Sequence, residues 1–143
     1  MRNRNADGGY SPPMAQTDLI LTPDARAPSK AREFLAEVLA DQAGSEWLAS
    51  AQLALSEVVT NAVRHGFVGS SGSLRLSFER TDGLIRIRVT QPGPVPERPT
   101  IVSMPDPWST SGYGLGVVDA VAHRWGVQLD PPSVWFEMHR EDH

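Results

Sequence analysis

Several residue types and sequence features are missing from this chain, and each absence excludes a class of protein. None of the 143 residues is cysteine, which excludes disulfide frameworks and thiolate metal sites. Lysine occurs once, at Lys30, and no Gly-Lys-Ser/Thr sequence is present, which excludes a P-loop. The formal net charge is −4, whereas general binding of nucleic acid needs a basic face. We therefore expect no direct contact with nucleic acid.

Long apolar runs are also missing. No stretch approaches the length of a membrane span, and the first residues lack the apolar core of a signal peptide. We therefore expect a cytoplasmic protein with no membrane contact. Residues 1–16 are polar and contain several glycines and prolines, which predicts a disordered N-terminal tail. The length of the chain fits one domain, which we place at 17–140.

Hydrophobic periodicity and turn residues predict the order of helices and strands. The segment from Ser45 to His65 has a helical apolar stripe, with Ser45 as its N-cap and Gly66 as a left-handed C-cap. The other predicted elements are an edge strand at 18–21, a helix at 25–40 with Pro28 in its first turn, a hairpin of strands at 73–80 and 84–90, a helix at 117–125 ended by Gly126, and strands at 127–129 and 134–138. This order predicts an α+β two-layer sandwich, with three helices on one face of a mixed, mostly antiparallel sheet.

Two polar residues accompany the apolar stripe of the helix after Ser45. Glu57 and Asn61 are four residues apart, so they lie one above the other on the same side of the helix. An Asn carbonyl oxygen is a ligand for a hard divalent cation, and a Glu carboxylate can take a proton or orient a hydroxyl group. The alternative is an ordinary solvated flank of the helix.

Three glycines, Gly112, Gly114 and Gly116, precede the predicted helix at 117–125. Glycine allows a phosphate to approach the backbone closely, and the free N–H groups at a helix start attract anions. The spacing does not fit a Rossmann fingerprint. The preceding segment, 91–111, has no periodicity and several prolines, which predicts either a disordered loop or a functional one, often a lid. A phosphate bound here must therefore be neutralised by backbone amides and a metal ion.

The combination resembles the GHKL ATPase superfamily. The sequences ALSEVVTNAVRHG and GLGVVDAVAHRWGV, with the terminal VWFE, resemble the short anti-sigma-factor serine/threonine kinases common in actinobacteria, over residues 17–140. The resemblance implies a Bergerat fold that binds ATP and Mg²⁺, with Glu57 as the general base and Asn61 as the magnesium ligand. It also implies a sigma factor and a STAS-type antagonist as partners, and a homodimer. The nucleotide-binding residues that it implies are Asn61, Arg64, His65, Gln91, Gly93, Gly112, Tyr113, Gly114, Leu115 and Gly116.

Two positions depart from the family pattern. The family has Asp where this chain has Gln91, and that Asp accepts a hydrogen bond from the adenine amine, so we expect weaker adenine binding or relaxed base choice. Related chains often carry an Arg near Tyr113, and Arg98 in the lid is a possible substitute. These departures keep open a second interpretation, a degenerate partner-binding module without kinase activity.

The remaining motifs have simpler interpretations. The alternate arginines of the hairpin, Arg75, Arg86 and Arg88, are expected on its solvated face, the alternative being a nucleic-acid patch. Three tryptophans are expected in the core: Trp47, Trp125 and Trp135. Trp108, in the lid, is expected to cover a nucleotide or a partner, or to anchor the loop.

Overall fold

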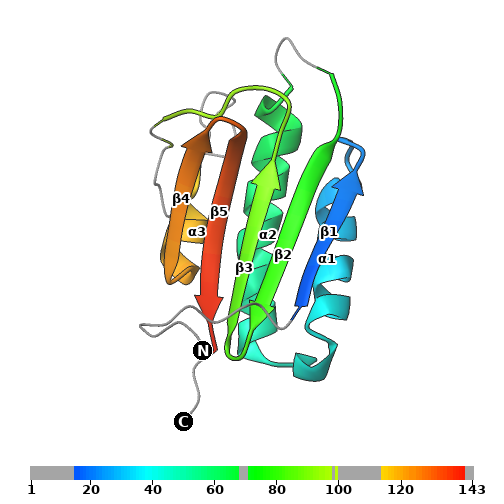
Figure 1. Cartoon of the computed structure of the whole chain (residues 1–143), viewed down its shortest axis with the longest axis vertical. Helices are drawn as coiled ribbons and strands as arrows, with labels where there is room; N and C mark the ends of the chain where they lie inside the picture. Colours follow the sequence, from blue (N-terminus) through cyan, green and yellow to red (C-terminus); the bar gives the residue numbers. More distant parts are fainter. Residues whose placement is uncertain (1–14, 68–70, 98, 100–113, 141–143) are drawn as a thin grey trace.

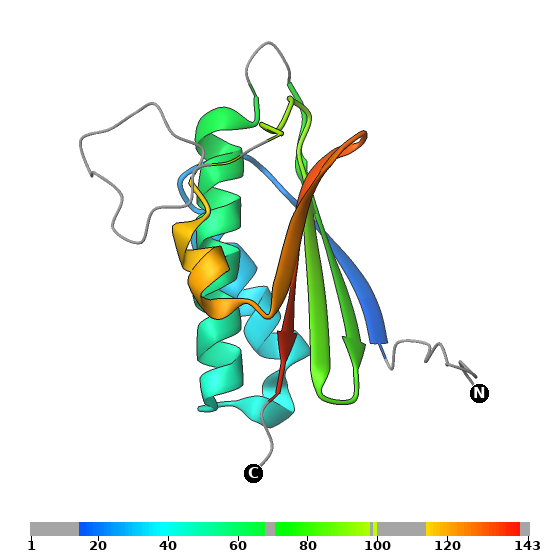
Figure 2. The ribbon, with the colours of Figure 1, turned by 90° about the vertical axis from the view of Figure 1, so that its left-hand side faces the viewer.

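The fold is a five-stranded sheet with all of its helices on one face (Figures 1 and 2). The computed structural model describes residues 15–67, 71–97, 99 and 114–140. In chain order the elements are β1 (Ala15–Leu21), α1 (Ala27–Val38), the short 3₁₀ helix η1 (Ala40–Gln42), α2 (Glu46–His65), β2 (Leu74–Thr81), β3 (Leu84–Thr90), α3 (Gly116–Val121), β4 (Arg124–Leu129) and β5 (Pro132–His139). The predicted order is confirmed.

The sheet has the strand order β1-β2-β3-β5-β4, and each of these neighbouring pairs is antiparallel. The prediction of a mixed sheet is therefore wrong in that detail. β1 lies at one edge, as predicted, and begins at Ala15, three residues before the expected start. Residues 1–14 of the predicted tail lie outside the described residues.

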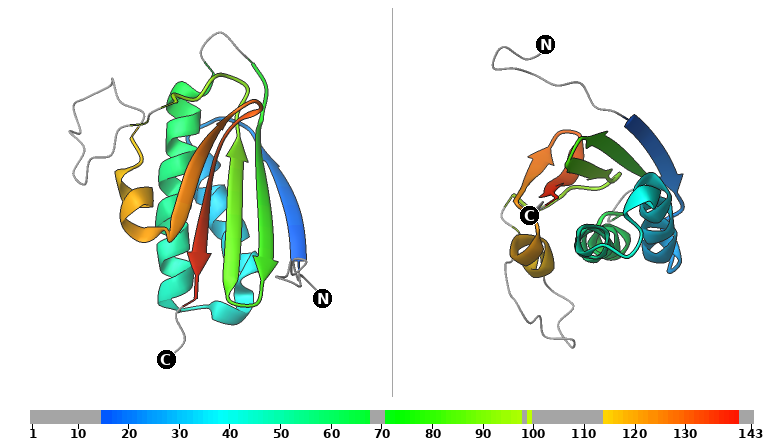
Figure 3. Two further views of the ribbon diagram at one scale, coloured as in Figure 1. Left: turned by 60° about the vertical axis from the view of Figure 1, so that its left-hand side comes forward. Right: turned by 90° about the horizontal axis from the view of Figure 1, so that it is seen from below.

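The core lies between one face of the sheet and the helices. The alternation in β2 and β3 places apolar side chains on this face, as in the pairs Leu76 with Val89 and Phe78 with Ile87. α2 crosses the middle of the sheet, flanked by α1 and α3 (Figure 3). The apolar stripe of α2 is buried as predicted, with only Val63 partly exposed: Leu48, Ala51, Leu55, Val58, Val59 and Ala62.

Among the described residues, no helix lies against the opposite face of the sheet (Figure 2). Arg75, Arg86 and Arg88 lie there, as the solvated-face interpretation predicts, whereas Arg80 of β2 lies on the helix side and donates to Val38 at 3.1 Å. Arg86 pairs with Glu137 at 3.0 Å, and Arg88 donates to Gln128 at 2.8 Å. Trp135 also lies on this face, with the Arg86 guanidinium 4.4 Å from its ring centre, so its assignment to the core is wrong. Trp47 is buried in the core, as predicted.

The predicted helix at 117–125 is shorter in the structure. α3 ends at Val121, and β4 begins at Arg124, where it pairs with β5. Gly126 does not end a helix: it lies in β4 opposite Trp135, where a Cβ atom would be 2.8 Å from the indole ring. Pairing with a strand thus overrides the helical spacing of Trp125, whose Nε1 donates to Asp119 at 2.9 Å.

Candidate functional site

α2 carries the two polar residues singled out from the sequence. Ser45 caps it, since its hydroxyl accepts the N–H of Leu48 at 3.1 Å. Burial of the apolar stripe fixes the rotation of the helix about its axis. Glu57 and Asn61 are thereby directed towards α3 and the segment that precedes it.

Glu57 contacts the first turn of α3. Its carboxylate accepts the backbone N–H of Val118 at 2.8 Å and that of Val117 at 3.2 Å. Burial raises the pKa of the Glu57 carboxyl, and these two hydrogen bonds oppose part of the rise because they favour the ionised form. A half-buried carboxyl with a raised pKa can exchange a proton closer to neutral pH than an ordinary glutamate can.

Asn61 contacts the glycine segment itself. Its Nδ2 donates to the carbonyl oxygen of Gly114 at 2.5 Å, and the side chain is buried. A carboxamide that donates through nitrogen still has its Oδ1 as an acceptor. Asn61 therefore joins α2 to the residues before α3. The two bonded residues are 53 positions apart in the sequence, and both were predicted site residues.

The turn after β3 meets the C-terminal end of α2. The N–H of Gly93 donates to the carbonyl oxygen of Gly66 at 2.6 Å, and the side chain of Gln91 packs against Gly66. A Cβ atom on Gly93 would lie 2.5 Å from the Gly66 oxygen, and one on Gly66 would lie 2.8 Å from Cδ of Gln91. Both positions need glycine because the two backbone segments approach so closely.

Gln91 is almost completely buried, at 3% exposure. Its Nε2 donates to two carbonyl oxygens of its own turn, those of Pro94 at 2.9 Å and Gly93 at 3.1 Å. Its backbone N–H donates to Pro132 at 3.0 Å, which joins the turn to β5. The side-chain NH₂ group is thus engaged within the protein.

The glycine segment is described from Gly114 onward. Leu115 is fully buried, and Gly116 is the first residue of α3. Gly112 and Tyr113 lie outside the described residues, as do Arg98 and Trp108. The proposed substitute cation and the predicted cover of the site therefore stay predictions.

Arg64 and His65 occupy the last turn of α2. Arg64 is exposed, whereas His65 is partly buried. Both lie one turn beyond Asn61, at the end of the helix that the 91–94 turn contacts.

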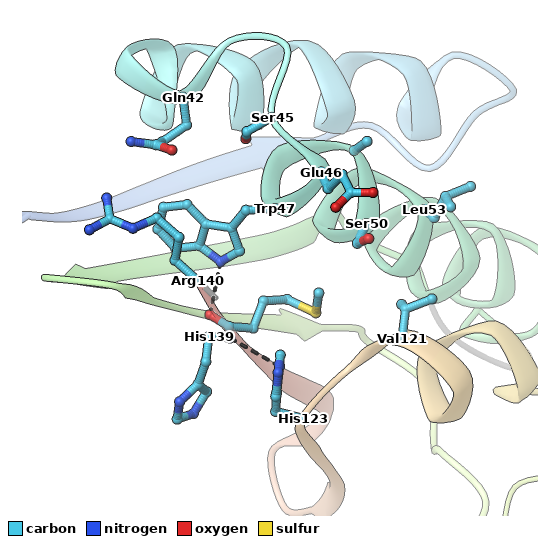
Figure 4. A pocket seen from close by; sticks show the side chains of 12 residues that line it. Gln42, Ser45, Glu46, Trp47, Ser50, Leu53, Val121, His123, His139 and Arg140 are labelled. Carbon is cyan, nitrogen blue, oxygen red and sulfur yellow. Dashed lines mark hydrogen bonds between the residues drawn. The ribbon is translucent and has the colours of Figure 1, made fainter. Parts of the chain in front are cut away.

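A cavity of about 610 Å³ lies elsewhere, at the other end of α2. Figure 4 shows Ser50 and Leu53 of α2 on one side of it, and Val121 and His123 on the other. Trp47 lies beside this cavity, and its Nε1 donates to Met138 at 3.1 Å. None of the site residues predicted from the sequence lines it.

The side-chain oxygen atoms of α2 near α3 fit a magnesium-bound nucleotide. Mg²⁺ prefers oxygen ligands, and Asn61 Oδ1 would supply one, with the Glu57 carboxylate one turn away on the same side of the helix. Among the described residues, no group of three or more His, Cys, Asp or Glu side chains could hold a metal ion. Mg²⁺ commonly takes several of its ligands from phosphate oxygens and water.

Two parts of this arrangement differ from the sequence-based expectation or have no signature in the sequence. Gly66 was interpreted as a left-handed cap, but its φ is −80°, and glycine is required there by the approach of Gln91. The backbone amides of Val117 and Val118 were not recognised as partners of Glu57, since a backbone donor has no sequence signature. The Gly after His65 was a usable signal for close approach, but it fits a helix cap equally well.

No curated protein matches the chain. The structure is similar to that of the RsbU and RsbW domains of Rv1364c from Mycobacterium tuberculosis, with a TM-score of 0.60 and 22% identity. That match covers 90% of this chain and 33% of the other, so this chain spans about a third of the length of that relative.

The described helices give no sign of a membrane segment, since none of them is both long and apolar enough to cross one. The family model for the histidine kinase-like ATPase domain matches residues 21–135, which includes α2, the turn after β3 and α3. The chain therefore belongs to the histidine kinase-like ATPase domain family.

Proposed function

We propose that this protein is an ATP-dependent serine/threonine protein kinase of the anti-sigma-factor type. It phosphorylates a STAS-type antagonist and binds a sigma factor. Membership of the histidine kinase-like ATPase family supports the nucleotide, and the similarity to a structure containing an RsbW domain supports the anti-sigma role. The observation that carries the proposal is that Glu57 and Asn61 of α2 both contact the segment Gly114 to Val118.

In this proposal each residue has a distinct task. When bound, magnesium-ATP supplies the phosphoryl group and the positive charge that offsets the phosphates. Asn61 holds the metal through Oδ1. Glu57 accepts the proton of the Ser or Thr hydroxyl, a task that its raised pKa favours. The glycine segment and the turn at Gln91 and Gly93 form two borders of the nucleotide site.

Transfer of labelled phosphate from ATP to a STAS-type antagonist encoded near this gene tests the kinase. We expect magnesium-dependent transfer to a Ser or Thr of the antagonist, and a complex with a sigma factor when the antagonist is absent. Light scattering on the purified protein tests the proposed homodimer. Absence of transfer to every nearby antagonist, with nucleotide bound, would refute the kinase and retain the family.

A second candidate is a partner-binding module that has lost phosphotransfer. The engagement of Gln91 with its own turn favours it, because the position that contacts adenine in the family does not present a carboxylate here. Calorimetry with ATP, with and without Mg²⁺, separates the two candidates. Undetectable binding of ATP together with stable binding of a sigma factor would support the module.

A further inference from the structure

Two buried carboxamides hold the two glycine-containing segments of the proposed site. Asn61 Nδ2 bonds the Gly114 carbonyl oxygen, and Gln91 Nε2 bonds those of Gly93 and Pro94. A carbonyl oxygen only accepts hydrogen bonds, so the NH₂ end of each side chain must face its partner. Both side chains are more than nine-tenths buried, at 8% and 3% exposure.

We infer that Asn61 and Gln91 are positioning residues whose NH₂ groups fix both segments in place. This inference rests on the proposed function, since the segments are those that would surround the nucleotide. Asn61 secures Gly114 against α2, beside the contact of Glu57 with Val117 and Val118. Gln91 closes the turn whose Gly93 amide bonds Gly66 at the end of the same helix.

This role of Gln91 differs from a contact with the adenine base of the nucleotide. If Gln91 recognised an amino group of a base through an oxygen acceptor, a carboxylate in its place would serve as well or better. In the structure, a carboxylate would instead face two carbonyl oxygens in a buried site, which is repulsive. The same contrast applies to Asn61, because a carboxylate is at least as good a ligand for Mg²⁺ but cannot donate to Gly114.

The near-isosteric variants Asn61→Asp and Gln91→Glu therefore test the inference. Hydrogen exchange without nucleotide is measured by NMR at the amide of Gly93 for Gln91→Glu, and at the amides of Val117 and Val118 for Asn61→Asp. We expect exchange at these amides to accelerate by at least about tenfold. We also expect affinity for magnesium-ATP to fall about tenfold or more in both variants.

Gln52→Glu is the matched control. Gln52 also lies on α2 and donates through Nε2 to a backbone carbonyl oxygen, that of Arg32 at 3.1 Å, at the contact with α1. This variant should lower stability without a selective effect on Gly93, Val117 or Val118, and should keep the affinity for nucleotide. If either test variant does not fold, Gln91→Met and Asn61→Leu remove the donors without adding a charge.

Acidification supplies a readout that a general loss of stability would not give. A protonated carboxyl can donate again, and burial favours its neutral form, so protection at Gly93 in Gln91→Glu should recover as pH falls. Wild type at the same pH controls for the ionisable groups on the surrounding elements, namely Glu57, Arg64 and His65 on α2, Glu97 after the turn and Asp119 on α3.

The outcomes separate the inference from the proposed function. Unchanged exchange at the reporter amides, or variants that bind magnesium-ATP as tightly as wild type, would overturn the positioning role. A wild-type protein that binds no nucleotide would overturn the proposed function, and the exchange rates would then decide alone whether the two carboxamides hold the segments.

Discussion

At the two ends of α2, the surrounding groups shift the pKa of a carboxyl group in opposite directions. Near its start, Asp41 receives two hydrogen bonds from Arg80, at 2.6 and 2.7 Å, which hold the pKa of Asp41 well below its usual range. In its second half, Glu57 receives only backbone N–H bonds among those described, and burial raises its pKa. The first arrangement keeps a charge in place, whereas the second leaves the carboxylate able to accept a proton.

The neighbouring groups extend this contrast. At the start of α2, Trp47 is enclosed by Arg80 and Arg140, whose guanidinium groups lie 5.7 and 5.8 Å from its ring centre, and it bonds Met138. These contacts join α2 to the ends of β2 and β5. In the second half, the polar contacts run to glycine-containing segments instead. One end of the helix stabilises the fold, and the other end builds the candidate site.

Replacing Glu57 should have the largest effect on function. Glu57→Gln keeps an acceptor for the amide of Val118 but cannot take a proton, so phosphotransfer should fall by about 10²–10⁴-fold. Affinity for magnesium-ATP should change much less. Rates of labelled phosphate transfer and calorimetry check both expectations, and transfer within threefold of wild type would exclude Glu57 as the base.

Gly93→Ala should disrupt the junction between the turn after β3 and α2. A Cβ atom 2.5 Å from the Gly66 oxygen forces the two backbones apart, at a cost of about 1–3 kcal/mol in the free energy of unfolding. Nucleotide affinity should fall as well. Gly83→Ala is the control, because Gly83 has a φ of +75° with open space around it, so its loss of about 1 kcal/mol should leave affinity unchanged.

Trp47→Phe tests the opposite end of the helix. It removes the bond to Met138 and leaves a buried carbonyl oxygen without that donor, which should lower the free energy of unfolding by about 1–3 kcal/mol. Phosphotransfer and nucleotide affinity should be unaffected. Chemical denaturation and the transfer assay measure the two effects, and a parallel loss of nucleotide affinity would show that the two ends are coupled.

The smallest effects are in the pH dependence of stability, and they should have opposite signs. Asp41 has a lowered pKa, so it stabilises the fold above the usual carboxyl range and loses this contribution as pH falls. Asp41→Asn should therefore be less stable than wild type near neutrality, with a gap that closes on acidification.

Glu57 has a raised pKa, so its contribution is present at low pH and is lost as pH rises through that pKa. Glu57→Gln should be slightly more stable than wild type near neutrality, and this gap also closes in acid. Thermal unfolding of the two variants over a series of pH values checks the signs. If both variants differed from wild type in stability in the same direction near neutral pH, the contrast between the two carboxylates would be contradicted.

Local pattern was enough to predict most of the fold. Alternation in the hairpin, the cap at Ser45 and the stripe of α2 depend on neighbours in sequence, and each is confirmed. Prediction failed where a distant partner decided. Arg124 and Trp125 continue the helical spacing but pair with β5, and Trp135 lies on the open face of the sheet because its neighbours Val134 and Phe136 face the core.

Spacing in the sequence was enough to place the candidate residues Glu57 and Asn61 on one side of α2, because helical geometry follows from spacing alone. Tertiary structure alone decided what these residues contact. Folding places the NH₂ group of Gln91 against its own turn, and it makes Gly66 a point of close backbone approach rather than a left-handed cap. Hydrogen bonds to backbone groups depend on which segments meet in space, and that cannot be derived from the identity of the residues.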